Sequence, residues 1–227
     1  MDKFTIIIPV YNEEELIKKS TLRLINFLDK KDYLYEILLV DNGSTDGTKE
    51  IGLGLSKQCK NVIFFSVTKN KAPGLAFKEG VLKARYENII SIDMDLSVEL
   101  EFVEKAVELL RRYDIVIGSK ITGEQKRSFF RKLPSFVYIQ LVKMLLGLSF
   151  SDYSMAAKGY KRDIILKCLD RIDKGSSYVI EIIYFAKKNG KKLIEVPVAC
   201  NDKRKSKFNI FNESWYRLWN LIRLWIS

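Results

Sequence analysis

The sequence contains no histidine, three cysteines in 227 residues, and no long uncharged apolar run. Without histidine the usual imidazole base and the usual zinc ligand are both missing, which disfavours zinc enzymes and histidine-dependent catalytic triads. Cys59, Cys168 and Cys200 are odd in number, widely spaced and form no CxxC pair. This pattern favours a reduced cytoplasmic chain over a disulfide-linked one. No stretch reaches the roughly 18 uncharged apolar residues that a membrane-spanning helix needs.

Positive charge is in excess, because 39 Lys and Arg residues against 28 Asp and Glu residues give a formal net charge of +11. Such an excess favours phosphate-rich partners, among them nucleotides, nucleic acids and anionic membrane surfaces. No motif of basic and aromatic residues accompanies the charge before the C-terminal tail, so we expect no nucleic-acid partner. The hydrophobic content of 47% is sufficient for one sizeable core.

Short β-branched runs alternate with segments of helical spacing in the first half of the chain. We expect strands at residues 4–10, 36–41, 62–67, 88–93 and 114–118. This alternation predicts an α/β fold with a mostly parallel central sheet and helices on both faces. In such sheets ligands bind at the carboxyl ends of the strands.

Polar segments follow three of the expected strands: PVYNEE at 9–14, DNGSTDGT at 41–48, and Asp93-Met94-Asp95. Each is weak evidence alone, since the second segment would suit any strand-to-helix turn, with Ser44 or Thr45 as a helix cap. At one shared sheet edge, however, the paired carboxylates of Asp93 and Asp95 can hold a divalent metal against a diphosphate. The sequence therefore predicts an enzyme that acts on a nucleotide-activated substrate.

These segments resemble the family 2 inverting glycosyltransferases with the GT-A fold. The resemblance continues through GSK at 118–120, DYSMAAKGYKR at 152–162, residues 181–197 and DKRKSK at 202–207. The last segment is typical of the branch that resembles dolichol-phosphate mannose synthase and other polyprenyl-phosphate glycosyltransferases. The resemblance implies transfer of a sugar from a nucleoside-diphosphate sugar of the GDP or UDP type to a polyprenyl phosphate, with Mg²⁺ or Mn²⁺ as cofactor. It also implies a GT-A domain at 1–210, with a Rossmann-like nucleotide-sugar half at 1–120 and an acceptor half at 121–210.

The resemblance assigns a role to individual positions. The residues expected to bind the nucleotide sugar are Pro9, Tyr11, Glu13, Asp41, Asn42 and Asp93. Those expected to bind the metal are Asp93 and Asp95, and the expected catalytic residues are Asp95, Asp152 and Arg131. Those expected to contact the acceptor or its phosphate are Arg131, Ser135, Arg204, Ser206 and Lys207.

Four positions depart from the family pattern, and one of them is Ser97, which stands where the lipid-phosphate branch often has Gln. Asn42 stands where the family has a second Asp, so its amide oxygen would have to accept the N–H of the base, and the nucleotide stays open. Ala156 and Ala157 replace the usual Gly-Phe pair.

Asp152 is the best candidate for a general base, although it could equally hydrogen-bond backbone amides. A phosphate acceptor needs little help from a base because it is already anionic.

The C-terminal segment 211–227 predicts an amphipathic helix. It places Arg217, Asn220 and Arg223 on one stripe and carries all three tryptophans of the chain. Indole and guanidinium groups suit the headgroup boundary, so we expect a helix at the membrane interface and a peripheral protein on the cytoplasmic face. Packing on the domain, or on a second subunit of a homo-oligomer, stays open. The apolar segment 136–150 is too short for a span and carries Lys143.

Other functions also stay open. The transferase could act on a different membrane-associated or glycan acceptor. A sugar-nucleotide pyrophosphorylase should carry a Gly-rich, basic loop after the first strand, where this chain has PVYNEEE. A non-catalytic GT-A-like scaffold in a membrane complex is suggested by Asn42 and Ala156.

Overall fold

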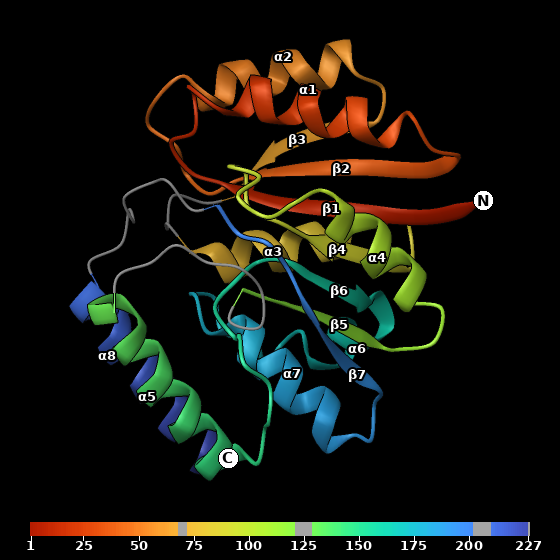
Figure 1. Ribbon diagram of the computed structural model, residues 1–227. Helices are drawn as coiled ribbons and strands as arrows, with labels where there is room; N and C mark the ends of the chain where they lie inside the picture. The colour runs from red at the N-terminus through yellow and green to blue at the C-terminus, as the bar shows by residue number, and fades with distance from the viewer. Residues whose placement is uncertain (68–71, 121–128, 202–209, 227) are drawn as a thin grey trace.

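The structure is a computed structural model that describes residues 1–67, 72–120, 129–201 and 210–226, without the side chains of 129–135 and 210–212. The described residues form one sheet of seven strands in the order β3-β2-β1-β4-β6-β5-β7 (Figure 1). The strands are β1 (Asp2–Val10), β2 (Tyr33–Asp41), β3 (Val62–Ser66), β4 (Asn88–Ser91), β5 (Ile115–Ser119), β6 (Lys158–Lys161) and β7 (Leu193–Pro197). Strand β6 runs antiparallel to both β4 and β5, and the other pairs are parallel.

Helices cover both faces of the sheet because the buried strands carry apolar side chains on both sides. On β1, Phe4, Ile6 and Ile8 belong to one core cluster and Ile7 belongs to the other. The first cluster lies under α1 (Ile17–Leu28), α2 (Thr48–Gln58) and α4 (Glu101–Leu109). The second lies under α3 (Pro73–Lys83), α5 (Phe129–Leu146), α6 (Arg162–Cys168), α7 (Tyr178–Lys188) and α8 (Ile210–Ile226).

The predicted fold class is confirmed, and each of the five expected strands is present. Strand β4 ends at Ser91, so the Asp93-Met94-Asp95 segment forms the loop after the strand. Strands β6 and β7 were not predicted. The sequence of β6, Lys158–Lys161, is KGYK, which is short and polar and shows no β-branched run.

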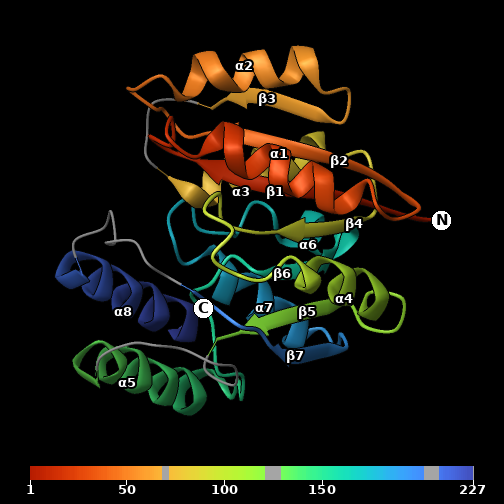
Figure 2. The same ribbon diagram turned by 45° about the horizontal axis from the view of Figure 1, so that its top comes forward.

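Helices α5 and α8 pack side by side at the outer side of the second layer (Figure 2). None of the described helices is long and apolar enough to cross a membrane. The polar stripe of α8 faces the domain: Asn220 Nδ2 donates to Ser177 Oγ at 3.2 Å, and Arg223 Nη2 donates to Glu181 Oε1 at 3.1 Å.

The side of α8 that carries the tryptophans lies at the surface. The exposed fractions of Trp215, Trp219 and Trp225 are 72%, 65% and 55%. On the neighbouring α5, Phe136 and Met144 are also exposed, at 59% and 71%. Leu221 of α8 is fully buried in the second core cluster, so α8 packs on the domain through Leu221 and Asn220 and leaves its tryptophans at the surface.

Candidate active site at the strand tips

Three polar loops meet at one edge of the sheet, as the sequence predicted. Strand β1 lies between β2 and β4, and Val10 at the end of β1 pairs with Asp41 at the end of β2. Ser91, the last residue of β4, pairs with Ile7 of β1, and Asp93 follows two residues later. The carboxyl ends of these parallel strands thus bring residues 9–14, 41–48 and 93–95 together.

The loops after β1 and β2 are joined by hydrogen bonds between backbone and side chain. The N–H of Asn12 donates to Ser44 Oγ at 2.9 Å, and the N–H of Thr45 donates to Asn12 Oδ1 at 2.8 Å. Asn12 adopts φ of 52°, a left-handed conformation that asparagine tolerates better than most residues. Neither Ser44 nor Thr45 caps α2, because the N-cap position is Gly47, which has no side chain to act as a cap. The two hydroxyl residues instead serve this junction between loops.

A second set of bonds reinforces the junction. The N–H of Gly47 donates to Glu14 Oε2 at 2.7 Å, and the N–H of Glu14 donates to Asp46 Oδ2 at 3.2 Å. Glu13 donates its N–H to Thr48 Oγ1 at 2.7 Å. The acids in both loops thus satisfy backbone amides, and the two segments form one preorganised surface beside the strand tips.

Asp41 and Asn42 are both buried at the tip of β2. Asp41 Oδ1 accepts the N–H of Ser44 at 3.0 Å, and Asn42 Oδ1 accepts the N–H of Ala72 at 2.9 Å. A backbone N–H can only donate, so the branch of Asn42 that faces Ala72 must be the oxygen. The side-chain oxygen of Asn42, which was expected to accept an N–H of the nucleotide base, therefore already accepts a hydrogen bond from the protein.

The loop after β4 turns sharply at its acidic pair. The N–H of Leu96 donates to the carbonyl oxygen of Asp93 at 3.1 Å, and Leu96 adopts φ of 48°. Asp95 Oδ1 accepts the N–H of Ser97 at 3.0 Å. The side chain of Asp93 is exposed, and that of Asp95 is half-buried. The turn therefore fixes the Asp95 carboxylate, and both side chains keep exposed surface.

Asp93 keeps solvent contact although protein atoms surround it densely. This surrounding protein, followed by the charge of Asp95, raises the pKa of Asp93 to about 6. The positive charges of Lys120 and Lys158, and the backbone amide of Ala156, act in the opposite direction. A carboxylate pair in such a setting gains from a cation that neutralises it.

The acidic pair fits a metal that is shared with a substrate. The described residues hold no cluster of three or more His, Cys, Asp or Glu side chains that would form a protein-only metal cage. Mg²⁺ commonly binds through one or two carboxylates and completes its shell with water and substrate phosphates. Asp93 and Asp95 supply hard oxygen atoms of this kind.

Asp152 is an anchored carboxylate at the same edge. Its side chain is 2% exposed, and Oδ1 accepts the N–H and Oγ of Ser154 at 2.9 and 3.0 Å and the N–H of Met155 at 3.2 Å. Oδ2 lies 4.0 Å from Lys120 Nζ. Burial alone would raise the pKa of Asp152, but Lys158, Lys120 and the Ser154 bonds outweigh it and lower this pKa. Such a weakly basic group favours the amide-binding role over the role of a general base.

Lys158, the first residue of β6, is a member of this group that sequence reasoning did not single out. It is fully buried, and burial lowers the pKa of its ammonium to about 8 although Asp152 acts to raise it. The sequence contains one signal for it, its position inside the segment 152–162. Its burial follows from the antiparallel placement of β6, which the sequence pattern does not reveal.

The remaining predicted residues divide into three groups. Pro9 and Tyr11 are partly buried at the end of β1 and in the loop after it, and their role near a nucleoside stays a prediction. Arg131 and Ser135 lie on α5, but their side chains are outside the described part. The other phosphate candidates, Arg204, Ser206 and Lys207, lie outside the described residues altogether.

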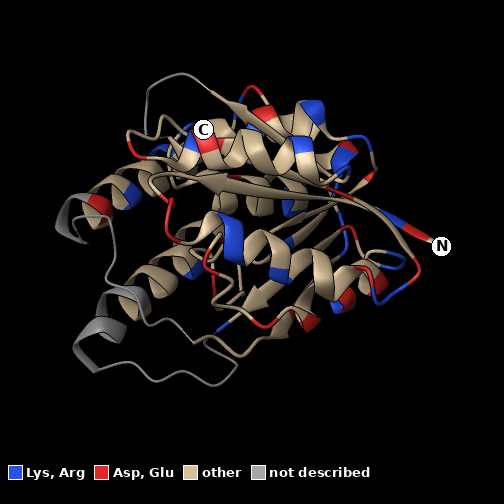
Figure 3. Cartoon of the chain, turned by 90° about the horizontal axis from the view of Figure 1, so that it is seen from above, with Lys and Arg blue, Asp and Glu red and all other residues tan. Residues whose placement is uncertain are grey.

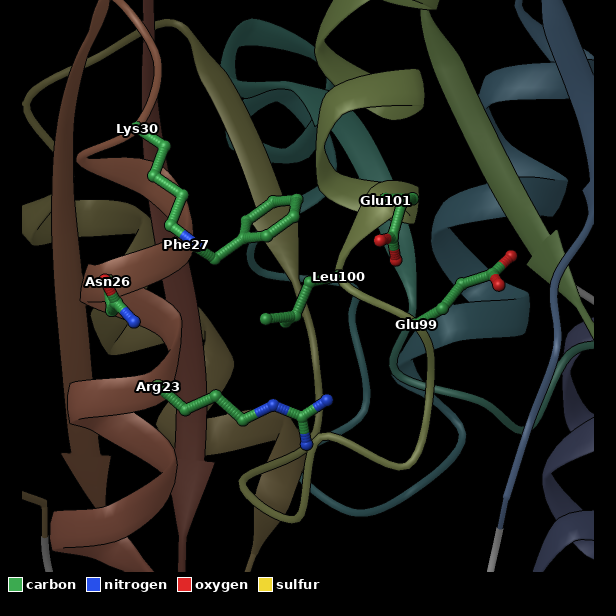
Figure 4. Close-up of a pocket in the computed structure, with 7 residues that line it drawn as sticks. All are labelled: Arg23, Asn26, Phe27, Lys30, Glu99, Leu100 and Glu101. Carbon is green, nitrogen blue, oxygen red and sulfur yellow. The ribbon is translucent and has the colours of Figure 1, made fainter.

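Charge is spread over the surface, with Lys and Arg interspersed among Asp and Glu on the helices and loops (Figure 3). A recess of about 250 Å³ lies elsewhere, between α1 and the start of α4, and is lined by Arg23, Asn26, Phe27, Lys30, Glu99, Leu100 and Glu101 (Figure 4). None of the predicted site residues lines this recess, so it is separate from the site at the strand tips.

Comparison with known proteins identifies the class. Residues 5–193 match the model of Glycosyl transferase family 2, so the chain belongs to that family. Its overall fold is the GT-A fold of the solved neighbours described below.

The chain is similar to curated polyprenyl-phosphate sugar transferases. It is 28% identical over 99% of its length to an undecaprenyl-phosphate 4-deoxy-4-formamido-L-arabinose transferase from Sodalis glossinidius, of which it covers 66%. It is 28% identical over 91% of its length to a dolichyl-phosphate beta-glucosyltransferase from Trichomonas vaginalis, of which it covers 68%. The chain thus spans about two thirds of the length of these relatives.

Solved structures share the fold at low sequence identity. A glucosyl-3-phosphoglycerate synthase from Mycobacterium tuberculosis, solved with Mn²⁺, UDP and glucosyl-3-phosphoglycerate, superposes with a TM-score of 0.74 at 16% identity, covering 98% of this chain and 80% of that one. A mannosyl-3-phosphoglycerate synthase from Rubrobacter xylanophilus gives a TM-score of 0.77 at 14% identity, covering 98% of this chain and 73% of that one.

Proposed function

We propose that this chain is an inverting glycosyltransferase that moves one sugar from a nucleoside-diphosphate sugar to a polyprenyl phosphate. The observation that carries the proposal is the meeting of three acidic loops at one sheet edge, in a family 2 chain that aligns over 99% of its length with an undecaprenyl-phosphate sugar transferase. The fold alone would not select the acceptor, because one structural neighbour is named for a small phosphate-bearing acceptor instead.

The donor would lie on the surface formed by the loops after β1, β2 and β4. Pro9, Tyr11 and Glu13 would frame the nucleoside together with Asp41 and Asn42. Hydrogen bonds within the protein join the first two loops, so binding would require little ordering of this surface. A preformed nucleotide surface is what a donor site needs.

The diphosphate would face Asp93 and Asp95. These residues would hold Mg²⁺ or Mn²⁺, which would stabilise the negative charge that develops on the departing nucleoside diphosphate. Lys120 Nζ lies 4.0 Å from Asp152 Oδ2 at the same edge and would add positive charge near the transferred group. Arg131, Ser135, Arg204, Ser206 and Lys207 remain candidates for phosphate contacts.

The reaction needs no strong protein base. An oxygen of the acceptor phosphate forms the bond to the anomeric carbon, while the bond from that carbon to the diphosphate breaks and its electron pair leaves with the diphosphate. No proton has to be removed from the acceptor. The absence of histidine and the low proton affinity of Asp152 both agree with an acceptor of this kind.

The acceptor would reach the site from a membrane on which the protein docks peripherally at the cytoplasmic face. The exposed tryptophans of α8 and the exposed Phe136 and Met144 of α5 belong to two neighbouring helices. Indole rings favour the headgroup boundary, and apolar residues around them would enter the acyl region. The formal net charge of +11 would add attraction to anionic lipids.

A panel assay tests the proposed function. The purified chain is incubated with membranes or undecaprenyl phosphate, with Mg²⁺ or Mn²⁺, and with labelled UDP and GDP sugars in turn. We expect label in the lipid extract with at least one donor. Label in water-soluble product alone would indicate a different acceptor, and no turnover of any donor would indicate a non-catalytic protein.

A further inference from the structure

Lys158 joins two segments at the strand tips through a fully buried ammonium group. Its Nζ donates to the carbonyl oxygen of Gly118 on β5 at 3.1 Å and to that of Met155 at 2.9 Å, in the turn before β6. Because Lys158 itself begins β6, three neighbouring pieces of backbone converge on one side chain.

The joined turn connects the two acidic parts of the site. Met155 also donates its N–H to Asp152 Oδ1 at 3.2 Å. The next residue, Ala156, directs its backbone amide at the Asp93 carboxylate and lowers the pKa of that group. In the sheet, Lys158 pairs with Ser91, two residues before Asp93. A shift of the turn would therefore move Asp152 and the Ala156 amide relative to Asp93.

Stability alone does not explain a lysine at this position. Removing an ammonium group from water is unfavourable, and apolar side chains of similar volume are often as stable or more stable in such places. The Gly118 and Met155 carbonyl groups offset part of this cost, and the buried Asp152 adds a favourable charge. The arrangement holds a specific geometry at an energetic cost.

We propose that Lys158 is a positioning residue for sugar transfer, which holds the Met155–Ala156 turn against β5 and thereby fixes Asp152 and the Ala156 amide relative to Asp93. Lys158 contacts neither substrate, since its side chain is completely buried. The expected effect on kcat rests on the proposed function. The expected effect on the turn itself rests only on the contacts of Lys158 with the backbone.

The kinetic test compares three variants. Lys158→Met removes the charge and both hydrogen bonds while keeping a side chain of similar length. We expect kcat to fall by about 100-fold, because the catalytic groups would be misplaced. The KM for the sugar nucleotide should change by no more than about twofold. Lys158→Arg keeps charge and donors and should recover most of kcat. Lys161→Met is the matched control on the same strand, because Lys161 Nζ donates to Asn88 Oδ1 at 2.8 Å at the far end of β6.

Hydrogen exchange gives a readout that does not depend on activity. Backbone amides of residues 154–156 should exchange faster in Lys158→Met than in the natural chain, and should be unaffected in Lys161→Met. If Lys158→Met fails to fold, Lys158→Gln replaces it. Unchanged exchange at 154–156, or a kcat within about twofold of the natural chain, would overturn the inference. If the natural chain transfers no sugar, the proposed function fails, and the exchange result alone decides the role of Lys158.

Discussion

Thr48 Oγ1 accepts a hydrogen bond of 2.7 Å from the backbone N–H of Glu13, so the first residue of α2 holds the loop that follows β1. Thr48 is fully buried, and its Oγ1 satisfies an amide close to the site. Removing this acceptor without changing the shape of the side chain would leave a poorly solvated N–H, and such groups are costly.

Thr48→Val should lower the free energy of unfolding by about 1–3 kcal/mol, because it leaves the Glu13 amide without its partner. It should also raise the donor KM, since the loop loses a tether. Urea unfolding and donor kinetics measure the two effects. Thr45→Val is the control, because Thr45 Oγ1 lies 3.4 Å from Asn12 Oδ1 in an exposed contact. Equal losses in the two variants would contradict the structure.

Two glycines on α2 should respond in opposite directions to alanine. A Cβ at Gly52 would lie 2.1 Å from Cδ2 of Phe64, whereas a Cβ at Gly54 would have no neighbour within 4 Å. Gly52→Ala should therefore destabilise the fold by about 1–3 kcal/mol through overpacking. Gly54→Ala should stabilise it by about 0.5–1 kcal/mol, because alanine is the better helix former. Thermal unfolding of the two variants distinguishes these outcomes, and a stabilised Gly52→Ala would show that α2 does not contact Phe64.

The two sides of α8 should have separable functions. Replacing Trp215, Trp219 and Trp225 with alanine should weaken binding to vesicles that contain anionic lipid, while the melting temperature stays close to that of the natural chain. Arg223→Ala should lower the melting temperature and leave vesicle binding nearly unchanged, because it removes the 3.1 Å hydrogen bond to the buried Glu181 carboxylate. Vesicle sedimentation and thermal unfolding measure the two effects. Unchanged vesicle binding in the tryptophan variant would exclude the membrane role, and its conversion from dimer to monomer would indicate an interface between copies.

The stability contributed by Asp152 should depend on pH. Its pKa is lowered in the folded state from an ordinary value of 3.8, so the ionised form stabilises the fold above that value. The unfolding free energy of the natural chain should exceed that of Asp152→Asn at neutral pH, and the difference should shrink as the pH falls below about 4. Denaturant titrations at several pH values check this. A difference that grows on acidification would mean that Asp152 is protonated in the folded chain.

Much of this site follows from sequence because strand tips are predictable in an α/β protein. The apolar runs of β1, β2 and β4 locate the sheet, and Asp41 and Asp93 follow from where those runs end. Lys158 could not be found in this way, because β6 is antiparallel and reads as a short polar segment. The orientation of α8 could not be predicted either. The spacing of its residues does not reveal that Ser177 and Glu181 lie where Asn220 and Arg223 can hydrogen-bond to them.

The acidic loop after β4 offers the most direct test of the account. The purified chain, Asp95→Asn and the control Asp163→Asn are each incubated with Mn²⁺, undecaprenyl phosphate and the labelled donor that the panel identifies. Asp163 is exposed on α6 and pairs with Lys167. Lipid-extractable label should form at similar rates in the natural chain and Asp163→Asn, and at least about 100-fold more slowly in Asp95→Asn, as for loss of a transition-state charge partner. Full transfer by Asp95→Asn, or lipid label from none of the three proteins, would contradict the account.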